Sequence, residues 1–142
     1  MWRMLSSALL VSLLLPACAP LPPSPADIQA KRFEVAPDKA AIYIVRTPMD
    51  SHEAAGLSLD YGSQISTNEG TYWRWDVAPG PHRVASYGWG TAEVNVNAQP
   101  GKIYFIRHTV MGQWRSGPQQ SWLQPLSEPE GRALVAQSVM IR

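Results

Sequence analysis

Hydrophobic and polar residues alternate most regularly over Thr71–Val77. Successive side chains of a strand point to opposite faces, so Trp73, Trp75 and Val77 are expected to share one face and Tyr72 to lie on the other, outward face. This pattern predicts a strand whose tryptophan face points inward and forms the centre of the core. Ala40–Arg46 is instead apolar at nearly every position, which predicts a strand that is buried on both faces or central in its sheet.

Six further segments have β character and are separated by turns rich in glycine, proline, asparagine or aspartate. They span 57–60, 64–67, 82–87, 91–96, 102–111 and 122–126. Ser127 and Glu130 have the spacing of a capping box, which predicts a short helix that continues over 132–137. We therefore expect an all-β fold: a single β-sandwich of seven or eight mostly antiparallel strands, immunoglobulin- or transthyretin-like, with a short C-terminal helix.

The chain begins with a segment typical of a signal peptide. Arg3 is the only charged residue of 1–17, and an apolar run follows it over Leu5–Leu15. That run is about half of the ~20 residues that a membrane-spanning helix needs, which favours a cleaved signal peptide. Its removal takes the formal net charge from +1 to zero. A neutral chain argues against a nucleic-acid partner, which a basic patch or stripe would indicate.

Leu15-Pro16-Ala17-Cys18 resembles the lipobox of bacterial lipoproteins. A leucine lies three positions before the cysteine and a small residue directly before it, whereas Pro16 departs from the usual residue type. Cys18 is the only cysteine, so it has no partner for an internal disulfide. The resemblance implies that Cys18 carries fatty acyl chains such as palmitate and becomes the first residue of the mature protein. The alternative is an ordinary signal peptidase site.

Four prolines within Ala19–Pro25 exclude a central strand and favour a semi-rigid polyproline II spacer. Ala26–Asp38 has mixed charge and weak periodicity, and we expect a disordered linker there. The alternatives are loose docking of Ile28, Phe33 and Val35 on the domain and a short helical turn near Ala26–Lys31. The expected organisation is a signal peptide (1–17), a lipidated cysteine with a proline-rich tether (18–38) and a sandwich domain (39–142).

No recognisable catalytic motif is present in the sequence. His52 begins a segment similar to HExxH, but the second histidine is missing. The spacing of the three histidines does not indicate a metal site either, and His108 is expected at the fraying end of a strand. We therefore expect a protein that is not an enzyme, with no catalytic residues, no metal ligands and no cofactor.

The candidate binding residues are two arginines on polar strand faces, Arg74 and Arg107, and two tryptophans in loops, Trp89 and Trp114. Together with Arg83, the arginines form either an ordinary solvated face or a patch for an anionic ligand or partner. Exposed loop tryptophans stack on sugar rings or anchor protein partners. The alternative is that these tryptophans fold back as caps on the core.

Four segments resemble, in order and spacing, the DUF2846 domain family. They are 59–62 (LDYG), 77–84 (VAPGPHRV), 101–107 (GKIYFIR) and 126–132 (LSEPEGR). Tyr61 departs from the commoner Asp-Gly turn of this pattern. The resemblance covers roughly Lys39 to Val135 and implies a small β-sandwich lipoprotein of the bacterial envelope, with no catalytic residues.

These observations predict a lipoprotein of the cell envelope, anchored in the outer membrane through Cys18 with its domain facing the periplasm. Ala19 follows the cysteine, and the absence of an aspartate there favours the outer membrane. The expected function is that of a non-catalytic interaction module, and the alternative is a carbohydrate- or peptidoglycan-binding module that uses the loop aromatics. The expected partners are the membrane and an envelope protein or cell-wall polymer, reached over a tether of up to ~60 Å.

Overall fold

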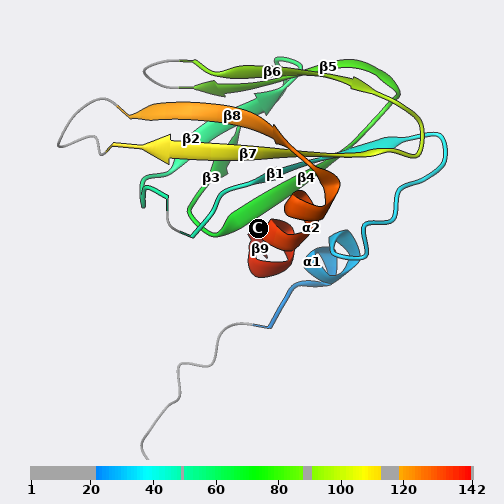
Figure 1. Cartoon of the computed structure of the whole chain (residues 1–142), viewed down its shortest axis with the longest axis horizontal. Coiled ribbons are helices and arrows are strands. Elements are labelled where there is room, and N and C mark those ends of the chain that lie inside the picture. The colour runs from blue at the N-terminus through cyan, green and yellow to red at the C-terminus, as the bar shows by residue number, and fades with distance from the viewer. Residues whose placement is uncertain (1–21, 49, 88–90, 113–118, 142) are drawn as a thin grey trace, which may run out of the picture.

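The computed structural model describes residues 22–48, 50–87, 91–112 and 119–141. Nine strands and two helices lie within these ranges. The strands form two sheets that pack face to face, and both helices lie on the outer side of the larger sheet (Figure 1). The expected all-β sandwich with a short C-terminal helix is confirmed.

The larger sheet has five strands in the order β8, β7, β1, β4 and β9, with the bounds Gln120–Leu126, Ile103–Met111, Ala40–Val45, Thr71–Val77 and Val139–Met140. The smaller sheet has four strands in the order β3, β2, β5 and β6, with the bounds Ile65–Thr67, Ala55–Leu59, Gly80–Tyr87 and Glu93–Ala98. Strands β1 and β7 pair in parallel, as do β4 and β9. The other pairings are antiparallel, so the arrangement is mostly antiparallel, as expected.

Strand β1 is central in the larger sheet, and all six of its residues are buried. Ala40, Ile42 and Ile44 belong to the apolar cluster between the two sheets. The alternate residues Tyr43 and Val45 belong to a second cluster, which lies under the helices. β-Branched and aromatic side chains suit a strand of this kind because they pack well on a pleated surface. The prediction that this strand is buried on both faces is confirmed.

The tryptophans of β4 point toward the smaller sheet, as predicted, but they do not form the centre of the core. Trp75 is only partly buried and packs against the margin of the inter-sheet cluster, as do Leu59 and Ile65. Trp73 is also partly exposed. The centre consists of smaller aliphatic side chains, above all those of β1. A bulky indole is rarely enclosed completely, and here both indoles lie near the margin of the sandwich.

The segment before the first strand begins with a helix. Helix α1 spans Pro25–Ala30, and the side chain of its N-cap, Ser24, accepts the Asp27 N–H at 3.1 Å. Pro25 lies at the start of the helix, where its missing N–H has no intrahelical acceptor in any case. Asp27 and Ala30 are buried, whereas Ile28 is 50% exposed. This short helix therefore presents one face to the sandwich.

A second apolar cluster fills the space between the helices and the outer face of the larger sheet. Its buried members are Ala30, Ala41, Tyr43, Val45, Tyr72, Phe105 and Val135. Phe33 and Val35 pack against it, so the prediction of a disordered linker over Ala26–Asp38 is wrong. The sequence also placed Tyr72 on an outward face of β4, yet this side chain is fully buried. Burial of apolar surface from water is the physical reason for both corrections.

Helix α2 spans Glu128–Gln137 and begins where the capping-box spacing predicted it. The Ser127 N–H and hydroxyl both donate to Glu130 Oε2, at 3.2 and 2.6 Å. Gly131 is buried against strand β7: a Cβ atom at this position would lie 2.1 Å from Cγ of Phe105. The missing side chain is what allows α2 to approach the sheet so closely.

We expect Gly131→Ala to lower the free energy of unfolding by about 1–2 kcal/mol. Alanine is the better helix former by ~1 kcal/mol, but overpacking against a buried ring costs ~1–3 kcal/mol or more, and we expect the clash to dominate. Urea unfolding measures the change. Ala133→Gly, at an exposed position of the same helix, is the matched control for helix propensity alone. A Gly131→Ala variant as stable as the native chain contradicts the packing argument.

Candidate functional site: a cavity beside strand β4

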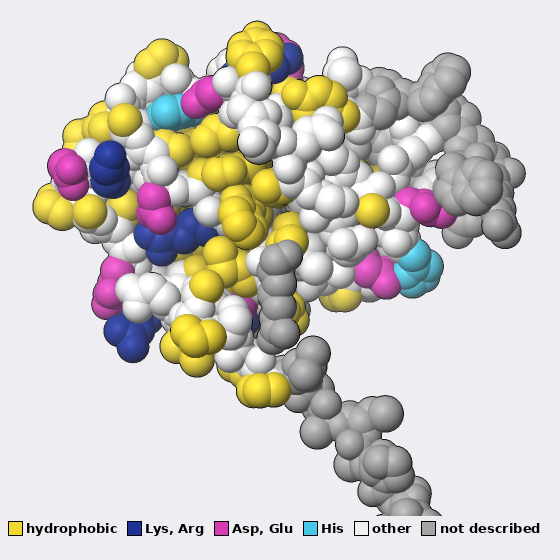
Figure 2. Space-filling view, turned by 180° about the vertical axis from the view of Figure 1, so that it is seen from behind, with side chains coloured by type: hydrophobic (Ala, Val, Ile, Leu, Met, Phe, Trp, Pro, Cys, Tyr) yellow, Lys and Arg dark blue, Asp and Glu magenta, His cyan; other side chains and the backbone are white. Residues whose placement is uncertain are grey.

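A cavity of about 670 Å³ lies between β4 and the N-terminal segment. It is lined by Ala26, Gln29, Ala30, Glu34, Val35, Ala36, Lys39, Arg74, Asp76 and Met140. Its volume falls within the ~300–1,000 Å³ typical of ligand pockets. The lining combines apolar side chains with two acidic and two basic ones. Figure 2 shows hydrophobic side chains gathered across one face of the molecule with oppositely charged side chains beside them. Such a lining suits a ligand with both apolar and polar groups.

Asp27 joins helix α1, which forms one wall of the cavity, to strand β9. Its carboxylate accepts the Met140 N–H at 2.9 Å and pairs with Lys31 Nζ at 3.1 Å. Lys31 Nζ also donates to Ser138 O at 2.7 Å. Burial by itself raises the pKa of Asp27, but the hydrogen bonds and the nearby ammonium group outweigh burial and hold that pKa below its ordinary value. Helix α1 and strand β9 are therefore held together by a buried, ionised carboxylate.

Tyr43 and Arg74 join the same wall to the sheet. The Tyr43 hydroxyl donates to Ala30 O at 2.6 Å and accepts from Arg74 Nη1 at 3.0 Å. Arg74 Nη2 donates to Glu34 O at 2.7 Å. Arg74 also donates to Asp76 Oδ1, from Nε at 3.1 Å and from Nη2 at 2.6 Å. Burial raises the pKa of Tyr43, so its hydroxyl stays protonated. The hydrogen bonds of Arg74 are thus directed to the protein itself.

The edge of β4 beside the cavity has main-chain groups without a strand partner. The Arg46 N–H donates to Thr71 O, so alternate residues of β4, starting at Thr71, bond toward β1 and those between them point away. Strand β9 pairs with Thr71 and Tyr72 only. Beyond Tyr72, the N–H and C=O groups of Arg74 and Asp76 point outward, and no other described residue pairs with them as a strand. An open edge of this kind is where a further strand can add.

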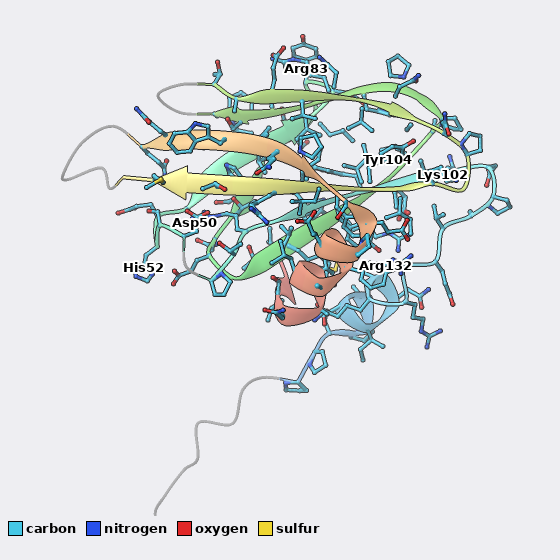
Figure 3. The ribbon with its side chains drawn as sticks, in the orientation of Figure 1. Asp50, His52, Arg83, Lys102, Tyr104 and Arg132 are labelled. Carbon is cyan, nitrogen blue, oxygen red and sulfur yellow. The ribbon has the colours of Figure 1, made fainter. Side chains whose placement is uncertain are left out.

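A buried polar network lies at the other end of the sandwich. Figure 3 shows Asp50 and His52 at this end, with Lys102 and Tyr104 at the opposite end. Arg46 is fully buried and pairs with Asp50 at 3.3 Å. It donates to Glu53 O and Thr67 O, both at 2.9 Å, and to Ser51 O. The network ties the loop after β1 to the sandwich and leaves no donor group of Arg46 directed to solvent.

His108 belongs to the same buried region. The sequence indicated the fraying end of a strand for this residue, and that prediction is wrong. Its Nδ1 lies 3.1 Å from Thr67 Oγ1 and its Nε2 lies 3.0 Å from Ser121 Oγ. Because the Thr67 hydroxyl donates to Ala55 O, it accepts from Nδ1–H, and the Ser121 hydroxyl then donates to Nε2. Burial, and secondarily the charge of Arg46, lowers the pKa of His108 to about 3. The ring is therefore a neutral structural link.

The predicted patch of three arginines does not form. Arg83 lies in the smaller sheet, where it pairs with Glu93 at 2.6 Å. Arg74 and Arg107 share the outer face of the larger sheet, but β1 lies between their strands. Arg107 Nε is buried and has no hydrogen-bond partner among the described residues. Of the two predicted binding arginines, Arg74 lines the cavity and Arg107 does not.

An exposed tryptophan lies near Arg107 on the same sheet face. Trp122 on β8 is 46% exposed and pairs with Thr109, two residues along from the Arg107–Gln124 pair. The sequence predicted a β segment over 122–126 but did not single out this side chain as a binding residue. The alternation of β8 around Pro125 was the signal that could have placed it on the outer face.

Three predicted site residues, Cys18, Trp89 and Trp114, lie outside the described residues, so their roles stay predictions. The cavity was not predicted, because its two walls come from segments far apart in the sequence. One local signal for its helical wall does exist. Ser24, Pro25 and Asp27 are the cap, first-turn proline and acidic residue of a typical helix start.

No family model matches this sequence, and no curated protein matches it either. The resemblances to the DUF2846 family and to lipoprotein signal sequences therefore stay predictions. Within the described ranges, no helix is long and apolar enough to cross a membrane. The same residues contain no group of three or more His, Cys, Asp or Glu side chains placed to hold a metal ion.

His108 makes the stability of the fold depend on pH. Its folded pKa of about 3 lies below the ordinary value of 6.5, so the unfolded chain takes up a proton that the folded chain does not. Stability is therefore lost as the pH falls below 6.5, by up to ~1.4 kcal/mol per pH unit. We expect urea unfolding to show about this loss between pH 6 and pH 5.

Two variants assign the effect. His82 lies 2.5 Å from Asp60 Oδ2 and 2.7 Å from Ala78 O. Burial lowers the pKa of His82, but these two acceptors outweigh burial and raise it. Protonated His82 therefore stabilises the fold below pH 6.5, and this contribution is lost only as the pH rises. The His82→Gln variant should still lose stability between pH 6 and pH 5 as the native chain does. His108→Gln should abolish this loss. An unchanged slope in His108→Gln contradicts the assignment.

Proposed function

We propose that this protein is a lipoprotein of the bacterial envelope whose β-sandwich is a non-catalytic interaction module. The cavity beside the open edge of β4 is the observation that carries the proposal. It combines a volume of about 670 Å³, an apolar lining with charged side chains, and main-chain groups that lack a strand partner in the described chain. Interaction modules commonly bind partners at an open sheet edge of this kind.

The anchor of this proposal is Cys18, in the segment that resembles a lipobox. A doubly or triply acylated cysteine gives stable membrane attachment, whereas one acyl chain does not. Six residues take the chain from Cys18 to the N-cap Ser24. A fully extended chain spans at most ~3.6 Å per residue, so the lipid would be attached within about 22 Å of helix α1. The domain would therefore stay close to the bilayer. The distance of about 22 Å is less than half of the ~60 Å that a tether ending at Lys39 would allow.

The buried hydroxyl–imidazole pair supports a non-catalytic module. Ser121 and His108 have the hydrogen bond of a nucleophile and its base, yet His108 is fully buried and Ser121 is 9% exposed. The pKa of His108 near 3 also makes the imidazole a weak base. A substrate carbonyl would have to enter the space between the two sheets to reach this pair. Its geometry fits a structural role.

The anchor predicts incorporation of fatty acid at one position. Cells that express the native chain should label it with a palmitate analogue, and the Cys18→Ser chain should stay unlabelled because the acylated thiol is gone. In-gel detection of the analogue measures the incorporation. Ser24→Ala, in the same N-terminal region, is a control that keeps the cysteine. Equal labelling of the native and Cys18→Ser chains, or labelling of neither, contradicts lipidation.

The interaction module predicts a partner contact at the cavity. A photo-crosslinking amino acid at Ala36, an exposed residue of the cavity wall, should give an adduct with an envelope protein in intact cells. The same amino acid at Glu93, exposed on the smaller sheet, is the matched control and should give much less of that adduct. Immunoblotting for the chain shows the shift in mass. No adduct from either position contradicts an interaction module at this surface.

A second candidate function is binding of a cell-wall saccharide, and Trp122 is the observation that favours it. An exposed indole beside an arginine offers a stacking face and a hydrogen-bond donor to a sugar ring. Trp89 and Trp114 remain further candidates for this function. Retention on purified peptidoglycan that is lost in Trp122→Ala distinguishes this function from binding at the β4 cavity.

A further inference from the structure

The unpaired edge of β4 begins where its pairing with strand β9 ends, so a strand added there would lie in line with β9. Strand β9 pairs with β4 in parallel only at Thr71 and Tyr72, where Ile141 N–H donates to Tyr72 O. The next outward-pointing positions, Arg74 and Asp76, offer an N–H and a C=O each along the cavity. The edge from Trp73 to Val77 is ~16 Å long at ~3.3 Å per residue. The cavity therefore contains the hydrogen-bonding pattern that a strand of about five residues requires.

The opposite wall restricts what can reach this edge. Helix α1 and the segment that contains Glu34, Val35 and Ala36 line the cavity across from β4. The hydrogen bond from Arg74 Nη2 to Glu34 O holds that wall near the strand. In a second folded copy, the β4 edge is covered by the same helical wall. Pairing two such edges would have to bring them past the walls of both copies. A single extended chain needs only the space that the cavity offers between wall and strand.

We propose that the cavity binds an extended peptide segment of a partner protein, which adds to β4 as a strand in continuation of β9. This inference rests on the proposed function as an interaction module and names the chemistry of its partner. Main-chain groups of the peptide bond to Arg74 and Asp76. Alternate side chains of the peptide point toward Ala26, Ala30, Val35 and Met140, so they are apolar and of small or medium size.

The charged residues at the cavity set a second requirement on the peptide. Lys39 is exposed, and the Asp76 carboxylate is 56% exposed although it accepts from Arg74. Both leave polar atoms available to a ligand, whereas Arg74 is 12% exposed and bonded to the protein. The side chains of the peptide that point away from the apolar wall are therefore polar. The expected sequence alternates between apolar and polar residues.

The test begins with the full chain, purified in detergent and used to select from a displayed library of random peptides of about five residues, the length of the open edge. We expect enrichment of alternating apolar and polar sequences. The best of these is then synthesised with blocked termini and titrated against the native chain and two variants at position 76. Asp76→Pro removes the outward N–H, and Asp76→Ala removes the same carboxylate but keeps the N–H.

We expect Asp76→Pro to weaken peptide binding about tenfold and Asp76→Ala to change it less than about threefold. Proline is tolerated at a sheet edge when its nitrogen faces away from the neighbouring strand, as it does here. Near-ultraviolet circular dichroism checks that the fold is kept. Should Asp76→Pro fail to fold, Ala26→Trp leaves the sequence of β4 unchanged, places an indole in the cavity from an exposed position of α1 and should abolish binding. In the native chain, bound peptide should slow hydrogen exchange of the Arg74 and Asp76 amides.

The outcomes separate this inference from the proposed function. Failure to enrich any peptide, equal binding to Asp76→Pro and Asp76→Ala, or unprotected amides at Arg74 and Asp76 overturns strand addition. Concentration-dependent dimerisation that Ala26→Trp abolishes also overturns it, because the occupant would then be a second copy. In each of these cases a crosslinked envelope protein at Ala36 still supports an interaction module. Loss of the crosslink as well removes the proposed function with it.

Discussion

The outer face of the larger sheet is apolar, and the need to cover it is the constraint on which the rest of the structure depends. Tyr43, Tyr72 and Phe105 lie on that face and are almost completely buried. The opposite face of the same strands already packs against the smaller sheet. Burial of a large apolar side chain contributes ~1.5–3 kcal/mol relative to exposure. Two sheets alone would leave this face in water, so a third layer is required, and helices α1 and α2 supply it.

The third layer is assembled from both ends of the described chain, and Asp27 holds those ends together. Its almost fully buried carboxylate accepts the Met140 N–H and pairs with Lys31. A buried carboxylate left without its hydrogen-bond donors costs at least ~1–3 kcal/mol. The same arrangement creates the cavity. Helix α1 contacts β9, and no described residue pairs as a strand with the open edge of β4 past Tyr72.

The strands could be predicted because their signals are local. The bounds of β4 are those of the alternating segment Thr71–Val77, and α2 begins at its predicted cap. Helix α1 was predicted only as an alternative to a disordered linker, because its six residues follow a proline-rich run and are stabilised by a hydrogen bond across 113 positions of the sequence. The environment of His108 depends on Thr67 and Ser121, which lie in two other strands. The cavity depends on the same kind of long-range contact, so no local pattern indicates it.

The place of α1 in the fold also changes what binding strength the proposed module needs. A strand of about five residues added to one edge makes few hydrogen bonds, each with a net contribution of only ~0.5–1.5 kcal/mol, so its affinity in solution is modest. A lipid attached close to Ser24 would hold the cavity near the bilayer. A partner in or on the same membrane would then meet the cavity at a high effective concentration, which rises as the tether shortens. Under the proposed lipid anchor, weak strand addition would be sufficient near the membrane, whereas it would be too weak at the end of a long, mobile linker.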